Sequence, residues 1–326
     1  MSNHPPMERE MPVRQKDDAS EVVVIGAACL DIKGRVGGAG DVIMGTSNPG
    51  DVRISAGGCA RNIAENLARL GMSVSLLSVV CADDFGTAIV QHTERAGVDT
   101  DHMLMSCDHR SAAYIALLGG DGELLMGIDD TITVGELTPA YIERHTTMLQ
   151  SARMVVLDAN VPLASAALVR TICAAAGVPL TLDPVAYAPA LRYRPIIGAF
   201  ALITPNLIEA EVLSEMPISD VTGGILAAKH LLALGVGTVI ITMADRGLVY
   251  ATGATSGHVP AIPIEIIDPT GAGDALTAVV VYGMLNGIPV DEAVRLGVSA
   301  ATLTLESTET VRHDLTLDQL YAQMVI

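Results

Sequence analysis

A glycine-rich segment places an acid where a phosphate would bind. In DPTGAGDALTAVVVYG, residues 268–283, Gly271, Ala272, Gly273 and Asp274 come directly before an apolar run that predicts a helix. Helix N-termini have unpaired N–H groups and a partial positive charge, and glycines let a phosphate approach them. A carboxylate there would repel the phosphate unless it accepts a proton from a hydroxyl that attacks a phosphoryl group. The alternative interpretation is that Asp274 only caps a helix.

Other nucleotide and metal patterns do not occur in the chain. It contains no GxxxxGK[ST], which excludes a P-loop enzyme. VIGAACLD, residues 24–31, lacks the GxGxxG spacing of a NAD-dependent dehydrogenase. The five cysteines form no CxxC pair, which favours a reducing compartment over a disulfide or zinc framework.

Composition limits the classes of partner. The chain has 326 residues, half of them apolar, which is enough for one large α/β domain. A formal net charge of −18 argues against binding to nucleic acid or to anionic membranes. The first twenty residues are polar and contain no signal-peptide core, and no apolar run is long enough to span a bilayer. The sequence therefore predicts a flexible tail over 1–20 and a soluble, cytoplasmic protein that binds small metabolites.

The elements that must position the acid alternate along the chain. Apolar runs predict strands at 21–32, 73–80, 154–159, 179–184, 201–206 and 238–243. Helical spacing predicts helices at 61–71, 86–96, 163–176, 223–234 and from about 273. This alternation indicates a mainly parallel sheet with helices on both faces, and ligands bind at the carboxyl ends of such strands. Two segments that break the alternation, near 32–45 and 111–128, are predicted to form a small β lid.

Three motifs together resemble the ribokinase-like (PfkB) family of small-molecule kinases. DPTGAGD resembles the family's DTxGAGD signature, with Pro269 inserted. ISAGGCARNIAENLARLG, residues 54–71, resembles its GG-x-x-x-N-x-A segment, and TPNLIEAE, residues 204–211, its N-x-x-E motif. They occur in the family's order over nearly the whole chain. The resemblance implies a three-layer α/β sandwich with a β-sheet lid, formed by a kinase domain over 21–326.

The resemblance also assigns roles to the phosphate side of the site. It makes Asp274 the base that deprotonates the acceptor hydroxyl, and makes the backbone of 271–273 the anion hole. Asn206 and Glu209 would organise Mg²⁺ around the phosphates of ATP, although the same pair is also typical of a helix cap. Thr242, Gly247, Asn206, Gly271 and Gly273 would contact the nucleotide. Ala244 departs from the pattern, because the family often has glycine there.

Acceptor and cation positions follow in the same way. Asp31, Gly57, Gly58 and Asn62 match the family's acceptor-binding positions, and Asn160 aligns roughly with another. Asp268 and Thr270 match positions that build a monovalent-cation loop in potassium-activated members. The C-terminal part of that loop is harder to match in LTLESTETV, residues 303–311, so the sequence leaves dependence on K⁺ open.

One further resemblance narrows the range of candidate acceptors. SNPGDVRISAGGCARNIAENLARLG, residues 47–71, resembles the corresponding segment of pseudouridine kinases within the family. It implies transfer of phosphate from ATP to the 5′-hydroxyl of pseudouridine, with Asn48, Arg61 and Ser111 as candidate contacts to the base. The alternative interpretation of Arg61 is a solvated residue on a helix. Ribose or another nucleoside is the alternative acceptor, and a non-catalytic sugar or nucleoside sensor is the alternative class. Relatives often form dimers through the lid, so a homodimer is expected.

Overall fold

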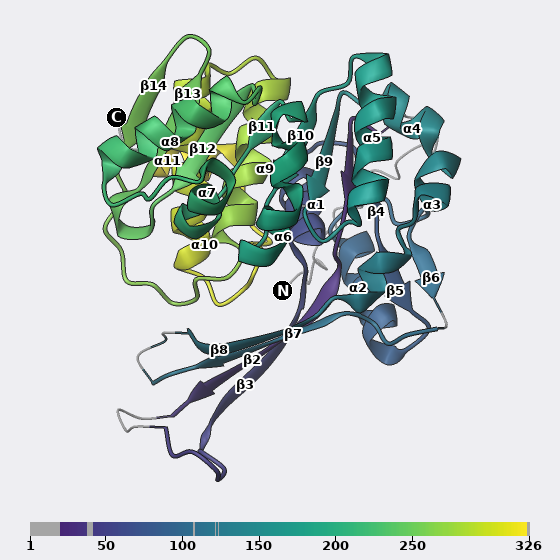
Figure 1. The fold of residues 1–326 in the computed structure, drawn as a ribbon. Helices are drawn as coiled ribbons and strands as arrows, with labels where there is room; N and C mark the ends of the chain where they lie inside the picture. The colour runs from purple at the N-terminus through teal and green to yellow at the C-terminus, as the bar shows by residue number, and fades with distance from the viewer. Residues whose placement is uncertain (1–19, 38–41, 107, 121, 123, 325–326) are drawn as a thin grey trace, which may run out of the picture.

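The computed structural model describes residues 20–37, 42–106, 108–120, 122 and 124–324. The tail predicted over 1–20 therefore lies almost entirely outside the described residues. The remainder folds as a central sheet between two helical layers, with a small separate sheet projecting from it (Figure 1). None of the helices in the described ranges is long and apolar enough to cross a bilayer.

Eight strands form the central sheet within the described residues, in the order β14-β13-β12-β11-β10-β9-β1-β4. The six strands from β12 to β4 in this order pair in parallel, and β13 pairs antiparallel with both β12 and β14. The predicted mainly parallel sheet is thus confirmed. The strands are β1 (Val22–Ile25), β4 (Val74–Leu77), β9 (Met154–Asp158), β10 (Leu180–Asp183), β11 (Leu202–Ile203), β12 (Thr238–Thr242), β13 (Leu248–Thr252) and β14 (Ser256–Val259).

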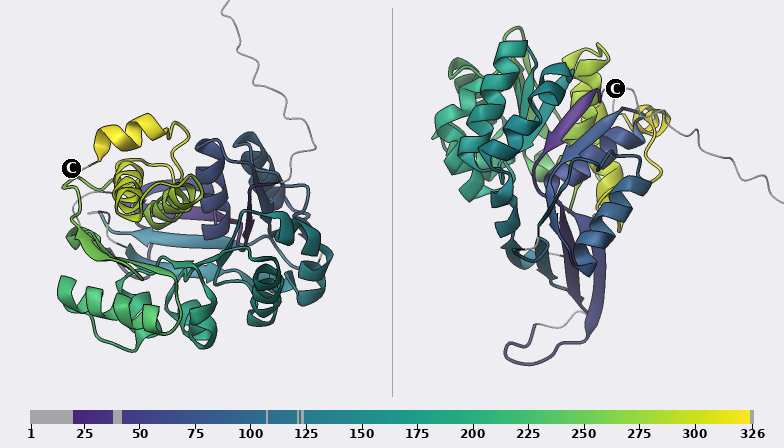
Figure 2. Two further views of the ribbon diagram at one scale, coloured as in Figure 1. Left: turned by 90° about the horizontal axis from the view of Figure 1, so that it is seen from above. Right: turned by 90° about the vertical axis from the view of Figure 1, so that its right-hand side faces the viewer.

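Alternating side chains of the buried strands face two separate cores. Val23 and Ile25 of β1 belong to one apolar cluster, and Val22 and Val24 belong to the other. The first core is closed by α3 (Pro139–Arg144), α4 (Thr146–Ser151), α5 (Leu163–Ala176), α6 (Tyr187–Tyr193), α7 (Leu207–Ser214) and α8 (Val221–Ala233). The second is closed by α1 (Cys59–Arg69), α2 (Asp84–Arg95), α9 (Ala272–Leu285) and α10 (Val290–Leu305), and α11 (Leu317–Gln323) packs on α10. Figure 2 shows the two layers on either side of the sheet.

The small sheet consists of β3 (Gly50–Gly57), β2 (Cys29–Val36), β7 (Ala113–Leu118) and β8 (Leu124–Asp130), in that order. It begins only a few residues after β1 ends, so it projects from the carboxyl ends of the central strands (Figure 2). The strand partner of β2 lies at 50–57, later than the predicted segment near 32–45. β5 (Val79–Cys81) and β6 (Leu104–Ser106) form a separate pair, and 3₁₀ helices occupy 132–136, 194–199 and 244–246.

The run EVVVIGAACLDI contains two strands where one was predicted. The extended run is interrupted at Gly26, between β1 and β2, where φ is +154°. A side chain on Gly26 would begin 2.2 Å from the carboxyl carbon of Asp158, so only glycine leaves room for that carboxylate. The break redirects the chain from the central sheet into the small sheet, which brings Asp31 to the carboxyl ends of the central strands.

The small sheet has one polar face and one apolar face. Ser55, Asp31, Tyr114 and Asp129 pair across the four strands on one face. On the opposite face, Ile54 pairs with Ile32, which pairs with Ile115, which pairs with Ile128. Ile54 is 63% exposed and Ile128 is 52% exposed. The next row on this face contains Val52, Leu117 and Met126, which are also exposed. An exposed apolar surface of this kind marks an interaction site.

Candidate active site

The helix predicted from about 273 begins one residue earlier, inside the GAGD motif, since α9 starts at Ala272. Gly271 is the N-cap of α9 with φ +85°, a left-handed conformation that favours glycine. The first helical bond runs from the N–H of Ala275 to the carbonyl of Gly271, which leaves the N–H groups of 272–274 without intrahelical partners. A side chain added at Gly273 would meet open space. An anion therefore has both room and donors at this helix end.

Asp274 is buried in the first turn of α9 and is held by a neighbouring helix. It is 7% exposed, and its Oδ2 accepts a hydrogen bond from Nδ2 of Asn62 on α1 at 2.7 Å. Burial raises the pKa of Asp274 to about 7, and donation by Asn62 partly opposes that rise. A carboxylate whose pKa lies near neutral pH is suited to accept a proton from a hydroxyl.

The residues predicted to bind the acceptor come together at the start of α1, the helix that carries Asn62. Asp31 on β2 is 3% exposed, and burial raises the pKa of its carboxyl group. A side chain on Gly57 would begin 2.1 Å from Oδ1 of Asp31, and one on Gly58 would begin 2.4 Å from the carbonyl oxygen of Ala27. The two glycines are therefore required by close approach, and Gly58 is the N-cap of α1.

Asn160 lies at the end of β9, next to a buried acid that sequence analysis did not single out. Asp158 is fully buried, and its carboxylate accepts hydrogen bonds from the backbone N–H groups of Ala27, Asn160 and Ala60 at 2.7, 2.9 and 3.3 Å. Burial raises its pKa to about 6, and the backbone donors oppose the rise. Asp158 thus joins the loops after β1 and β9 to the start of α1.

Asn206 and Glu209 form a capping box at the start of α7. Oδ1 of Asn206 accepts from the N–H of Glu209 at 3.0 Å, and Glu209 accepts from the N–H and Nδ2 of Asn206 at 2.8 and 2.7 Å. Burial raises the pKa of Glu209 to about 7. The cap interpretation is therefore present in the structure, and the buried carboxylate also faces the site.

Asp183, at the end of β10, completes a cluster of buried carboxylates. Its pKa is raised by burial and by the negative charges of Asp274 and Glu209. A divalent cation would relieve this burial and repulsion, and hard oxygen ligands suit Mg²⁺. No three His, Cys, Asp or Glu side chains of the described residues converge to hold a metal by themselves. The cluster fits a Mg²⁺ ion that takes its other ligands from phosphate and water.

The residues predicted to contact the nucleotide lie at the same edge of the sheet. Thr242 ends β12 and pairs with Asn206 through an isolated bridge. Gly247 has φ +82°, and a side chain there would begin 2.1 Å from the carbonyl oxygen of Val259. Ala244, where the family often has glycine, has φ +52°. The loop therefore keeps the left-handed turn without the residue that favours it.

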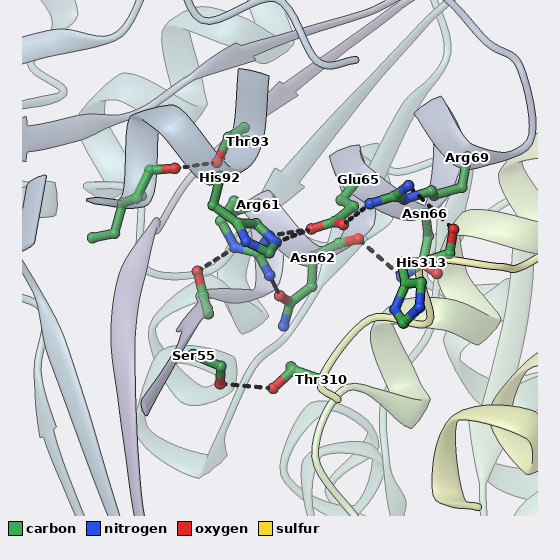
Figure 3. A network of polar contacts seen from close by, with 12 residues as sticks. Ser55, Arg61, Asn62, Glu65, Asn66, Arg69, His92, Thr93, Thr310 and His313 are labelled. Atoms are coloured by element: carbon green, nitrogen blue, oxygen red, sulfur yellow. Dashed lines mark hydrogen bonds and ion pairs between the residues drawn. The ribbon is translucent and has the colours of Figure 1, made fainter. Parts of the chain in front are cut away.

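Of the candidate base contacts, Arg61 has a different environment from either expectation (Figure 3). It is 1% exposed, so it is no solvated helix residue. Its guanidinium group donates to the carbonyl of Gly57 at 2.8 Å, to Oδ1 of Asn62 and to Oε2 of Glu65 at 2.5 Å. These contacts orient the Asn62 side chain, whose Nδ2 then points to Asp274.

The remaining two candidate contacts are also occupied. The Ser111 hydroxyl accepts from the N–H of Cys81 at 2.8 Å and donates to Asp83 at 2.7 Å. The Asn48 side chain closes a turn, since it exchanges two hydrogen bonds with the backbone of Ile43, both at 2.9 Å. Both residues therefore shape loops, and neither side chain is free to read a base in this conformation.

Comparison with known proteins defines the class. The profile described as pfkB family carbohydrate kinase matches residues 19–316. The pseudouridine kinase of Escherichia coli is 31% identical over 94% of this chain and 96% of its own length. The guanosine-inosine kinase of Exiguobacterium acetylicum is 29% identical over 89% and 96%. The Arabidopsis thaliana ribokinase complexed with ribose and ATP superposes with a TM-score of 0.80, at 21% identity over 94% and 99%.

The fold is ribokinase-like, as predicted, and the class is a kinase of sugar or nucleoside hydroxyl groups. The chain belongs to the pfkB family of carbohydrate kinases.

Proposed function

We propose that the chain transfers a phosphoryl group from ATP to the 5′-hydroxyl of pseudouridine and produces pseudouridine 5′-phosphate. The observation that carries the transfer is Asp274, a buried carboxylate with a pKa raised to about 7, held by Asn62 beside the unpaired N–H groups of α9. The E. coli pseudouridine kinase, similar over nearly the full length of both chains, supports the choice of acceptor. The cytoplasm, where ATP is held, is the proposed location.

Each side of the site has a distinct task in this proposal. Asp274 accepts the proton of the attacking hydroxyl, and the N–H groups of 272–274 stabilise negative charge on the transferred phosphoryl group. Asp31 and Asn62, with the close backbone at Gly57 and Gly58, grip the hydroxyls of the acceptor, with Asn160 at the rim. Asn206 and Glu209 would hold Mg²⁺ through water, and the ion would supply positive charge beside the phosphates of ATP.

The small sheet serves as the lid and as the contact between two copies. Its polar face carries Asp31, so closing over the acceptor would exclude water from the transfer. Its opposite face exposes apolar side chains of β3, β7 and β8, among them Ile54, Leu117 and Ile128. A second copy of the chain, which offers the same apolar face, is the proposed occupant.

The test is coupled ADP release with Mg-ATP against pseudouridine, uridine, guanosine, ribose and fructose. We expect the highest kcat/KM on pseudouridine and loss of turnover with Asp274→Asn. Preference for guanosine or ribose would keep the mechanism and replace the acceptor, in line with the guanosine-inosine kinase and ribokinase likenesses. Binding of these compounds without any turnover would favour a sensor and reject the proposal.

A further inference from the structure

Lys33 of β2 is a buried cation on the polar face of the small sheet. Its side chain is 7% exposed, whereas Lys229 on α8 is exposed. Lysine is buried in proteins almost only when its charge is paired. Nζ of Lys33 lies 2.8 Å from Oδ2 of Asp268 and 3.1 Å from Oγ1 of Thr310, 235 and 277 residues away in the sequence.

Both partners of Lys33 hold the turn that leads into α9. The other carboxylate oxygen of Asp268, Oδ1, accepts from the N–H of Thr270 at 2.8 Å. Gly271 packs so closely on Thr310 that a side chain there would begin 2.0 Å from the Thr310 carbonyl oxygen. The ammonium group therefore joins the small sheet to the turn at 268–271, from which the unpaired N–H groups of α9 begin.

A second strand of the small sheet reaches the same point. The hydroxyl of Ser55 on β3 lies 3.4 Å from Oγ1 of Thr310 (Figure 3). The turn before α9 is also held at the end of α10, because the N–H groups of Ile267 and Asp268 donate to the carbonyl of Leu305 at 2.8 and 3.3 Å. Lys33 thus lies at a junction of four chain segments, namely β2, β3, the turn at 267–271 and the segment at 305–310.

The polar groups at this junction do not fit a potassium ion. The family resemblance places a monovalent cation at Asp268 and Thr270, but both carboxylate oxygens of Asp268 already have donors. The ammonium group neutralises the charge that would attract the ion. A potassium ion at the same carboxylate would also be repelled by that ammonium group, in a buried region where charges interact strongly.

We propose that the Lys33 ammonium group takes the place of the monovalent cation, so that phosphoryl transfer by this chain needs no potassium. The proposal rests on the proposed kinase function. Lys33 is a positioning residue, because it acts through Asp268 and Thr310 and not on the reacting atoms. It lies two residues from Asp31 on the same strand and therefore on the same face of the sheet. Unlike a dissolved ion, it links the placement of the small sheet over the acceptor to the turn before α9.

The experiment compares the wild-type protein with Lys33→Met in potassium, sodium and tetramethylammonium chloride at one ionic strength. Wild-type turnover is expected to be the same in all three salts. Lys33→Met is expected to lose about 10²-fold in kcat in tetramethylammonium, because the turn is no longer held in place, and to recover in part with potassium. Lys229→Met, which removes an exposed lysine, should behave as wild type.

A second readout does not depend on turnover. The thermal midpoint of Lys33→Met should rise when potassium replaces tetramethylammonium, since Asp268 then has no other cation, while that of the wild type should stay constant. Potassium stimulation of the wild type, or full activity of Lys33→Met in tetramethylammonium, would overturn the proposal. If no acceptor is phosphorylated by either protein, the kinase function fails, and the midpoints still decide the role of Lys33.

Removing one member of a buried ion pair is strongly destabilising, whereas removing both is often tolerated. If Lys33→Met does not fold, Lys33→Met/Asp268→Asn replaces it. This double variant should fold, show a thermal midpoint independent of potassium, and turn over more slowly than wild type. A double variant as fast as the wild type would show that the junction does not position the anion hole.

Discussion

The carboxyl edge of the central sheet and the small sheet carry polar groups in opposite ways. The edge concentrates buried carboxylates, Asp158, Asp183, Glu209 and Asp274, and burial raises the pKa of each. The small sheet places its one buried lysine directly against Asp268 and leaves its other face apolar and exposed. The buried carboxylates of the edge therefore call for a cation and for a substrate hydroxyl that gives up a proton. The exposed apolar face of the small sheet calls instead for a surface that covers it.

The largest effect is expected at Asp274, the proposed proton acceptor of the edge. Asp274→Asn keeps the shape of the side chain but removes the proposed base, so kcat should fall by about 10³-fold, within the range for loss of general base catalysis. Single-turnover phosphorylation of the preferred acceptor measures the chemical step. Asp84→Asn, which changes an exposed acid on α2, should leave kcat unchanged. A variant at position 274 that retains native kcat would remove Asp274 from the mechanism.

The same substitution should stabilise the protein at alkaline pH. The folded state keeps the proton of Asp274 up to a pKa of about 7, whereas the unfolded chain releases it near pH 4. Stability from this group is therefore present below about pH 4 and is lost as the pH rises to about 7. Asp274→Asn avoids that loss, so its thermal midpoint at pH 8 should exceed that of the wild type, by about 2 °C per kcal/mol. A lower midpoint at pH 8 would contradict the raised pKa.

A smaller effect is expected from the residue that orients the base. The hydrogen bond from Asn62 lowers the pKa of Asp274, so Asn62→Ala should move the acidic limb of the kcat profile to higher pH. Loss of one charged hydrogen bond corresponds to about tenfold in rate below the midpoint. Asn66→Ala truncates a second asparagine, one turn later on α1, that has no contact with Asp274. It should leave the midpoint of the acidic limb unchanged. Equal shifts in both variants would argue for a general distortion of the helix.

The small sheet is tested by changing its apolar face. Ile54→Lys places a charge in the row Ile54, Ile32, Ile115 and Ile128, where a second copy would otherwise bury it. We expect light scattering after size-exclusion chromatography to report a dimer for the wild type and a monomer for Ile54→Lys. Leu226→Lys, on the exposed side of α8 at 53% exposure, should remain dimeric. A monomeric wild type would contradict the proposed contact between two copies.

The sequence predicted the parts of the site that local patterns encode. Gly271 and Asp274 were identified because a glycine turn and the first turn of a helix leave adjacent residues in the chain. β3 was missed although Val52 and Ile54 alternate with Arg53 and Ser55, a pattern typical of a two-faced strand. Asp158 and Asp183 were also detectable, since each follows a buried apolar run at the edge where ligands bind.

The remaining features depend on contacts between distant segments. Nothing near Lys33 indicates a partner at Asp268, because the small sheet must first be placed against the turn before α9. The two strands in the run at 21–32 were missed for a similar reason, since the break at Gly26 is required by the distant Asp158 carboxylate. Residue spacing in the sequence indicates helices, strands and turns. It does not indicate which buried charged residues pair with one another in the folded protein.

The smallest effect concerns the edge again, at the loop where Ala244 replaces the family's glycine. Ala244 has φ +52°, and a left-handed conformation costs a residue with a Cβ atom roughly 1–2 kcal/mol. Glycine avoids that cost but gains freedom in the unfolded chain, so Ala244→Gly should raise the free energy of unfolding by about 0.5 kcal/mol in urea denaturation. Ala174→Gly, at an exposed position of α5, should lower it by about 1 kcal/mol. Opposite signs for the same chemical change would show that the loop holds Ala244 in strain, and destabilisation at both positions would show that it does not.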